Sequence, residues 1–372
     1  MGLNFKNPLA LYEQIENDIK SKINKGELKI GDQIRSQSQL SKEYNVSLIT
    51  VKKALSNLIN EGILFSRVGK GTYIARKAKA VDISKHKSIG LVLRDLRHPF
   101  FSMIVHSVEE KAYQVGYNIL LSNSSGRIDK EESQISHFED IGVSGLVIAS
   151  MSLLYRATDN IIKLHKGNFP YVMVSYMEDP DIYYVGTDNE KGAFMATEHL
   201  IKLGYERIGY VNGGEGNLLG LLRKKGYEKA LKKYQKEMNS KLIFNLSLTE
   251  DRFKSGYKLG KEFLDLNIKP DALFFYTDLA ALGFQQGVTD LGLKVPDDVA
   301  IVGFDNIDLS KYASAPLTTI EQNANKIGEL AVESVIKRIE GKETSVRTIL
   351  EPKIIIRSSC GASLKNEKAI SN

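Results

Sequence analysis

The stretch SQSQLSKEYNVSLITVKKALSNLINEGILFSRVGKGTYI, from Ser36 to Ile74, decides how the first part of the chain folds. Ser36 followed by Gln39 is a capping-box pattern that begins a short helix. Ser47 caps a second helix, whose first turn is polar and basic, and Gly62 ends that helix. A basic hairpin with glycines in its turn follows. This order of elements predicts a winged helix-turn-helix, which places its second helix in the major groove of duplex DNA.

The apolar residues around this stretch fit the same fold. A helix with one apolar side precedes it and stops at Gly26, and a second apolar stripe lies inside the helix that Ser47 begins. The two stripes consist of Leu11, Ile15, Ile19 and Ile23, and of Val51, Ala54, Leu55 and Leu58.

Polar and basic side chains off these stripes are the expected DNA contacts. Serine and threonine donate to phosphates, lysine reaches phosphate or guanine, and Leu48 suits a thymine methyl group. The alternative is a three-helix module with a solvated face, which the order of caps, basic face and wing disfavours. The predicted DNA-binding residues are Arg35, Ser36, Gln37, Ser47, Leu48, Thr50, Lys52, Lys53, Arg67, Gly69, Lys70, Gly71 and Thr72.

The charge of the chain is concentrated in the same region. Residues 1–80 hold fourteen Lys and Arg against seven acids, whereas the rest holds 37 against 38, within a total net charge of +6. A basic unit joined to a neutral body is typical of a module that binds a polyanion. With 372 residues, 42% of them hydrophobic, we expect two or three folding units in a soluble protein.

Membrane and secretion signals are not evident in the sequence. No apolar run approaches the roughly 20 residues of a membrane span, and the first twenty residues lack the apolar core of a secretory signal. The single cysteine, Cys360, forms no internal disulfide. We therefore expect a cytoplasmic protein without a membrane partner.

The rhythm of the sequence changes after a polar linker at residues 76–87. Short β-rich runs then alternate with amphipathic helical stretches, which predicts α/β units with parallel sheets, arranged as two lobes. Residues 358–372 are expected to be a tail. The strand candidates are residues 89–93, 118–122, 145–150, 171–175, 207–211, 272–276 and 299–304.

Polar residues follow most of these strands. In open α/β sheets ligands bind beyond the carboxyl ends of strands, so these residues are candidates for a pocket between the lobes. Carboxylates, amides and hydroxyls suit a polyhydroxylated ligand, and Phe100 and Phe101 suit stacking on a sugar, although both also suit the core. Asp278 is alternatively a helix cap. The candidates are Arg94, Asp95, Ser122, Asn123, Ser175, Tyr176, Asn212, Thr277, Asp278, Asp305 and Asn306.

Residues 8–75 resemble the winged-helix domain of the GntR family of bacterial transcription regulators. The resemblance rests on PLALYEQI, the Gly26…Gly31-Asp32 turn, VSLITVKKAL and Gly69-Lys70-Gly71-Thr72. The chain departs from the family pattern in the loop before the second helix, where the family usually carries proline, an acid and arginine and this chain has Arg35, Gln37 and Ser38. Leu48 and Lys52 likewise stand where the family usually carries arginine.

Residues 88–357 resemble the effector domain of LacI-type repressors, which shares its fold with periplasmic sugar-binding proteins. The segments are IGLVLRDLRHPFFSMIVHSVEEKAYQVGY, VGTDNEKGAFMATEHLIKLGYERIGYVNG, PDALFFYTDLAALG, VPDDVAIVGFDNID and TTIEQNANKIGELA. A GntR head on such a body is the AraR-type arrangement. The resemblance implies a periplasmic-binding-protein-like (type I) domain, with lobe 1 at about 88–204 and 323–341 and lobe 2 at about 205–305 and 342–357.

The same resemblance implies functional residues and a partner. Arg223 and Asp305 correspond to effector contacts, with a salt bridge between the lobes as their alternative role, and Phe253 lies near the position of a stacking aromatic that Asp251 replaces. A homodimer is expected through helices at 100–116 and 278–291. The predicted effector-binding residues are Asp95, Phe100, Phe101, Asn123, Tyr176, Arg223, Phe253, Thr277, Asp278 and Asp305.

An enzyme is the competing class. Gly214, Gly216 and Gly220 follow a strand, but their spacing is one residue too long for a dinucleotide loop. The six histidines show no metal-binding spacing, and no Gly-x-Ser-x-Gly elbow or Walker loop occurs. A chromatin-like DNA binder would not need a two-lobed cleft. We therefore expect a non-enzymatic transcription regulator, a repressor without cofactor or metal, whose partners are operator DNA and a sugar or sugar derivative. The sequence leaves open which sugar, which operator and whether the ligand releases DNA.

Overall fold

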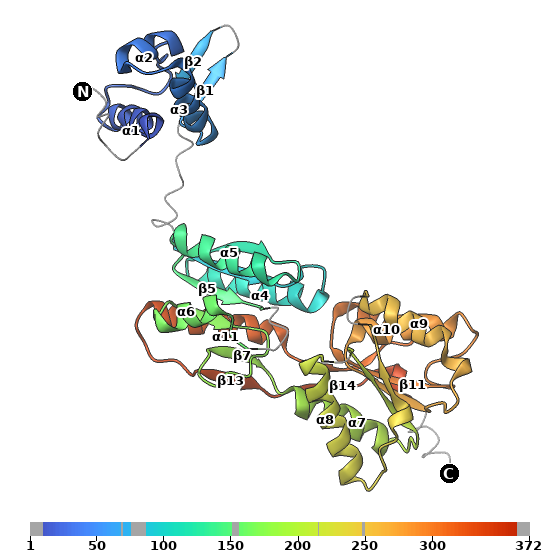
Figure 1. The fold of residues 1–372 in the computed structure, drawn as a ribbon. Coiled ribbons are helices and arrows are strands. Elements are labelled where there is room, and N and C mark those ends of the chain that lie inside the picture. Colours follow the sequence, from blue (N-terminus) through green and yellow to red (C-terminus); the bar gives the residue numbers. More distant parts are fainter. Residues whose placement is uncertain are drawn as a thin grey trace. The chain divides into compact units, whose positions relative to one another are not determined.

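The computed structural model describes residues 10–67, 70–75, 87–150, 156–214, 216–247 and 250–362. The chain divides into two compact units, Met1–Lys85 and His86–Asn372 (Figure 1). Most of the linker expected at 76–87, the expected wing residue Gly69 and the end of the expected tail lie outside the described residues. No helix among the described residues is long and apolar enough to span a membrane.

The first unit has the caps that its sequence predicts. Gln39 N donates to Ser36 Oγ at 3.3 Å, and Ser36 N donates to the Gln39 side chain at 2.9 Å. Ser47 Oγ accepts from Thr50 N at 3.2 Å. The elements are α1 (Leu11–Asn24), α2 (Gln37–Tyr44), α3 (Leu48–Asn60), β1 (Leu64–Arg67) and β2 (Gly71–Ile74).

The wing is an antiparallel pair that is fastened to the helical part by Gln33. Strands β1 and β2 pair from Leu64 opposite Ile74 to Arg67 opposite Gly71. Gln33 forms an isolated bridge with Tyr73, and its side chain donates to the Lys70 carbonyl at 2.8 Å. The core of the unit consists of Ile15, Ile19, Ile34, Leu40, Tyr44, Val51, Ala54, Leu55, Leu58, Leu64 and Ile74.

The second unit contains two six-stranded sheets, as the alternation of strands and helices predicted. Lobe 1 has the order β13-β7-β6-β5-β3-β4 and lobe 2 the order β14-β12-β11-β10-β8-β9. All neighbouring pairs are parallel except β12 with β14. The strands are β3 (Ser88–Leu93), β4 (Asn118–Asn123), β5 (Gly145–Ile148), β6 (Tyr171–Met173), β7 (Tyr184–Thr187), β8 (Ile208–Asn212), β9 (Ile243–Asn245), β10 (Ala272–Phe275), β11 (Ala300–Asp305), β12 (Thr318–Glu321), β13 (Arg347–Leu350) and β14 (Lys353–Ile355).

Helices cover both faces of each sheet (Figure 1). In lobe 1, α4 (Pro99–Gln114) and α11 (Ala324–Ile339) share one apolar cluster with the sheet, and α5 (Ile128–Asp140) and α6 (Asp159–Lys166) contribute to another. In lobe 2, α7 (Asn189–Lys202) packs on α8 (Leu218–Lys233), and α9 (Arg252–Lys261) packs on α10 (Asp278–Thr289). The short 3-10 helices are η2 (Ser240–Leu242), η3 (Phe263–Asp265), η4 (Asp308–Lys311) and η5 (Ser358–Cys360).

The chain passes between the lobes at three places in the described residues, which follow β7, β12 and β13. Two hydrogen bonds tie these crossings together. Thr187 Oγ1 donates to the Gln322 carbonyl at 2.7 Å, and Asp188 N donates to the Leu350 carbonyl at 3.2 Å. Three crossings that are bonded to one another form a hinge on which two lobes can move as bodies.

Three of the predicted boundaries are wrong. Helix α7 packs on α8 and on lobe 2 strands, so residues 189–204 belong to lobe 2 and not to lobe 1, whereas β13 pairs with β7 and places residues 347–350 in lobe 1. The expected tail does not begin at Ser358, because Ser359 and Cys360 are fully buried. Ser359 Oγ donates to the Ile301 carbonyl at 2.8 Å and thereby attaches η5 to the central strand β11.

Candidate functional site

The start of α3 is the most exposed apolar feature of the first unit. Leu48 is 52% exposed and Ile49 is 80% exposed, and Lys52 of the same helix is also exposed. Ser47 Oγ and Thr50 Oγ1 lie 2.8 Å apart at the N-terminus of the helix. Exposed apolar side chains suit the thymine methyl groups of a major groove, and the neighbouring lysine and hydroxyls suit the phosphates. Sequence reasoning missed Ile49, since an isoleucine alone gives no DNA-binding signal.

Three of the predicted DNA-contacting cations are held by neighbouring side chains. Arg35 Nη1 lies 2.9 Å from a Glu43 carboxylate oxygen. Lys53 Nζ lies 4.0 Å from the centroid of the Tyr12 ring, and the Arg67 guanidinium lies 5.4 Å from that of Phe65. These contacts orient the three cations at the surface of the first unit.

Lys52 and Lys70 are exposed and form no ion pair within the described residues. The remaining predicted contacts also lie at the surface: Ser36 and Gln37 are exposed at the start of α2, and Gly71 and Thr72 lie in the wing. Gly71 has a φ of 106°, a value that glycine adopts readily, and a Cβ there would overlap the Gln33 side chain.

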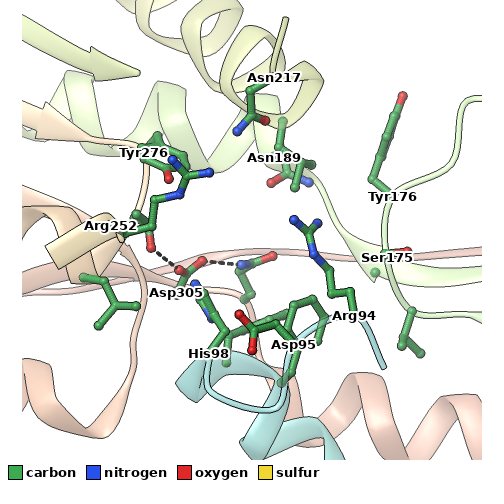
Figure 2. A pocket seen from close by; sticks show the side chains of 18 of the residues that line it. Arg94, Asp95, His98, Ser175, Tyr176, Asn189, Asn217, Arg252, Tyr276 and Asp305 are labelled. Carbon is green, nitrogen blue, oxygen red and sulfur yellow. Dashed lines mark hydrogen bonds between the residues drawn. The ribbon is translucent and has the colours of Figure 1, made fainter. Parts of the chain in front are cut away.

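The second site is a cleft of about 510 Å³ in the second unit, lined by both lobes. Its wall combines aromatic rings with guanidinium, carboxylate, amide and hydroxyl groups (Figure 2). The residues that line the cleft include Arg94, Asp95, Arg97, His98, Phe100, Phe101, Ser175, Tyr176, Asn189, Asn217, Arg223, Glu250, Asp251, Arg252, Tyr276, Thr277, Asp305 and Gln322.

Seven of the ten predicted effector residues lie in this wall: Asp95, Phe100, Phe101, Tyr176, Arg223, Thr277 and Asp305. The other three do not. The Asn123 side chain turns back to Ser125, at the end of an edge strand. Phe253 is 40% exposed on α9, so Asp251 and Arg252 of that segment line the cleft in its place.

Asp278 is a structural residue and not a helix cap. It is fully buried as the first residue of α10, which Thr277 precedes as the N-cap. Its carboxylate accepts hydrogen bonds from Thr319 Oγ1 at 2.5 Å and from Ile307 N at 2.9 Å. Burial, and then the charge of Asp305, raises the pKa of Asp278 well above its ordinary value. Asp278 therefore joins α10 to β12 and to the loop after β11.

Lobe 2 contributes a buried ion pair to the cleft. Arg223 Nη2 lies 3.7 Å from Asp305 Oδ1, and the guanidinium stacks on Phe304 at 3.6 Å from the ring centroid. Asn189 Oδ1 accepts from both Nε and Nη2 of Arg223, at 3.0 and 2.9 Å. Arg223, Asn189, Phe304 and Asp305 all belong to elements of lobe 2. The pair is thus not a salt bridge between the lobes.

Asp305 sits at a strained turn beside the hinge. It has a φ of 120°, outside the range that side-chain-bearing residues prefer. Its carboxylate accepts from Thr277 Oγ1 at 2.7 Å and from Gln322 Nε2 at 2.6 Å, as drawn in Figure 2. Gln322 directly follows β12 at a crossing, so the carboxylate connects the ligand cleft with the hinge.

The lobe 1 wall holds a second acid and a histidine. Although partial burial opposes it, hydrogen bonding by Arg97 lowers the pKa of Asp95, and the two side chains pair at 3.0 Å. Burial lowers the pKa of His98, so its imidazole is neutral at pH 7. His98 Nδ1 is buried without a hydrogen-bond partner in the described residues.

Sequence reasoning missed cleft residues that follow unrecognised strands. Asn189 follows β7 and Gln322 follows β12, and both strands are only four residues long. His98, Asn217 and Tyr276 also line the cleft. A search for acceptors and donors after every short β-rich run, YYVGT and TTIE included, would have found the first two.

The fold and these two sites define a class of protein, namely a DNA-binding regulator with a ligand-binding domain. The family described as "Bacterial regulatory proteins, gntR family" matches residues 11–74, and the "Periplasmic binding protein-like domain" matches residues 197–360. The chain belongs to the bacterial transcriptional repressors with a GntR-type DNA-binding domain and a LacI-type, periplasmic-binding-protein-like effector domain.

Two curated relatives of this chain are transcriptional repressors. An arabinose metabolism transcriptional repressor of Halalkalibacterium halodurans is 28% identical over 96% of this chain and 98% of its own length. The HTH-type transcriptional repressor PurR of Mannheimia succiniciproducens is 31% identical over 76% of this chain and 84% of its own length.

A solved structure is also similar to this chain. The LacI family transcriptional regulator of Enterococcus faecium with bound ribose is 26% identical, with a TM-score of 0.64. The alignment covers 73% of this chain and 98% of that chain.

Proposed function

We propose that the cleft of this repressor binds a sugar or sugar derivative, and that this ligand changes the affinity of the first unit for operator DNA. The observation that carries the proposal is the wall itself, where two aromatic rings in edge-to-face contact adjoin paired carboxylates, guanidinium groups and amides. Phe100 and Phe101 lie 5.5 Å apart between ring centroids, beside Asp95. Rings suit the C–H face of a sugar, and polar groups of both kinds suit its hydroxyls.

The size of the cleft and the position of Asp305 support the same ligand class. The cleft volume of about 510 Å³ falls within the range of volumes found for small-molecule binding sites. A ligand hydroxyl that donates to the Asp305 carboxylate competes there with the Gln322 amide, which lies at a hinge crossing. Binding energy in the cleft would then favour one arrangement of the lobes, and only this difference in affinity can change DNA binding.

We further propose a homodimer without catalytic turnover. One winged helix reads a half-site, so two copies on a roughly palindromic operator are expected. The expected dimer surface includes α4, where Tyr113 is 78% exposed and Val115, which follows the helix, is 40% exposed. The relatives named above are repressors, which supports a role in binding rather than in catalysis.

A direct test combines operator binding with a ligand panel. An operator would be selected from random duplexes with the purified chain, and its affinity measured by fluorescence anisotropy with and without pentoses, hexoses, deoxysugars and their derivatives. We expect one sugar class both to raise the melting temperature and to change the operator Kd. If no sugar or sugar derivative protects the fold, the proposed ligand class is wrong.

A further inference from the structure

The lobe 1 wall of the cleft carries a cation that has no counter-ion among the described residues. Arg94 follows β3, and its guanidinium points into the cleft (Figure 2). Within the described residues it forms no ion pair and donates no hydrogen bond. Its Cζ lies 5.9 Å from the centroid of the Phe101 ring. A half-buried guanidinium with five unused donors is costly once a ligand displaces the surrounding water.

The carboxylates of the cleft are already engaged elsewhere. None of the four lies within ion-pair distance of Arg94 in the described residues. Asp95 pairs with Arg97, Asp305 with Arg223, and Glu250 with Lys258, while Asp251 accepts from Lys254 N at 3.0 Å. The other cleft cation, Arg252, donates to the Ser247 carbonyl. No carboxylate among the described residues pairs with Arg94, which leaves that role to the ligand.

A second donor without a partner lies at the same sheet edge. Ser175 is 9% exposed, and its buried hydroxyl has no hydrogen-bond partner in the described residues. Val92 pairs with Ile148, and Ile148 with Met173, so Arg94 and Ser175 occupy equivalent positions two strands apart. Two strand spacings amount to roughly 10 Å between the backbones, a gap that an arginine side chain and one bound oxyanion fill.

We infer that the effector of this repressor carries an anionic group, a phosphate or a carboxylate, which Arg94 and Ser175 bind. An oxyanion only accepts hydrogen bonds, so it satisfies the guanidinium and the hydroxyl together and neutralises the charge. The lobe 2 end of the cleft, with Arg223 already balanced by Asp305, remains for neutral hydroxyls. This inference rests on the proposed sugar-type effector and narrows it to sugar phosphates or sugar acids.

Matched ligand pairs test this inference on the full chain. Calorimetry and thermal unfolding would compare ribose with ribose 5-phosphate, and glucose with glucose 6-phosphate and with glucuronate, plus inorganic phosphate alone. We expect an anionic member to bind on the order of 10- to 100-fold more tightly than its neutral partner, the range of a charge-assisted hydrogen-bonded pair. The phosphate and glucuronate arms show which oxyanion the site takes.

Variants assign the effect to the residue. Arg94→Gln should abolish the preference for the anionic ligand, and Arg94→Lys should restore part of it. Arg127→Gln changes an exposed arginine of the same lobe that pairs with Asp129 outside the cleft, and it should preserve the preference. Melting temperatures without ligand verify that each variant folds.

The possible failures are distinguishable. Binding of neutral sugars with no anionic preference, or an anionic preference that survives Arg94→Gln, overturns the inference and leaves the sugar-type function intact. If neither neutral nor anionic sugars protect the chain, both proposals fail.

Discussion

At the scale of single residues, the buried pair of Arg223 and Asp305 combines a structural with a ligand-binding role. Arg223→Met would leave the Asp305 carboxylate buried without its cation, and we expect a loss of about 3 kcal/mol in the free energy of unfolding together with loss of the ligand response. Asp305→Asn should likewise lose the response. Urea unfolding and calorimetry with the ligand measure both effects.

The double variant provides the control for this pair. Because it removes both charges, it should be more stable than the sum of the two single losses implies, while still failing to respond to ligand. Operator affinity without ligand should stay close to that of the unchanged chain in all three variants. Wild-type ligand affinity in both single variants would refute the assignment of the two residues to the effector site.

The free lysines of the first unit allow a second prediction at this scale. Lys52→Ala or Lys70→Ala should weaken operator binding and reduce the slope of log K against log salt by about 1, as expected for one lost phosphate contact. Lys53→Ala is the matched comparison, since the Lys53 ammonium rests on the Tyr12 ring and should contribute less. Anisotropy titrations at several salt concentrations give the slopes, and unchanged slopes for both lysines would count against the contacts.

The sequence predicted where the cleft residues lie better than it predicted which partners their side chains contact. Residues after strands can be placed at a sheet edge from sequence, and seven of ten candidates line the cleft for that reason. Whether a side chain points inward depends on neighbours that are distant in sequence. Asp278 bonds to Thr319 inside the lobe, and the Arg223 guanidinium is fixed by Asn189, neither of which sequence spacing reveals.

At the scale of elements, α9 and α10 are packed as closely as their backbones allow. A Cβ on Gly283 would overlap the Phe253 carbonyl, and one on Gly256 would overlap the Ala280 carbonyl. Gly283→Ala should therefore force the helices apart and destabilise the chain by about 1 to 3 kcal/mol, despite the better helix propensity of alanine.

Gln286→Ala, an exposed change on the same helix, is the control and should leave the melting temperature nearly unchanged. Thermal unfolding compares the two variants. A chain with Gly283→Ala that melts at the temperature of the Gln286→Ala chain would show that the two helices are free to separate without cost.

Strands in clear β-rich runs were predictable, whereas strands outside such runs were not. The seven expected strands are present, and β7, β9, β12, β13 and β14 were missed. Length alone does not explain the omission, because the expected strands β5, β6 and β10 also have only three or four residues. Three of these, β7, β12 and β13, precede hinge crossings, so the positions where the chain passes between the lobes could not be located from sequence. This explains why α7 and β13 were placed in the wrong lobes: their partners are set by tertiary pairing.

At the scale of the whole molecule, ligand binding in one unit must change DNA binding by another unit. The first unit holds the DNA-contacting residues and the second holds the cleft, so any effect of ligand on DNA is a coupling free energy between sites. Linkage requires that the factor by which ligand changes the operator Kd equal the factor by which operator changes the ligand Kd. We expect this factor to lie between about 5 and 150.

Calorimetric titration of ligand into the chain, free and saturated with operator, measures one factor, and anisotropy measures the other. Equal factors that both collapse to 1 in a Gln322→Ala variant that still binds the ligand would place the coupling at the hinge, because the Gln322 amide joins a crossing to the Asp305 carboxylate. A factor that persists in this variant would mean that the coupling does not depend on this hydrogen bond.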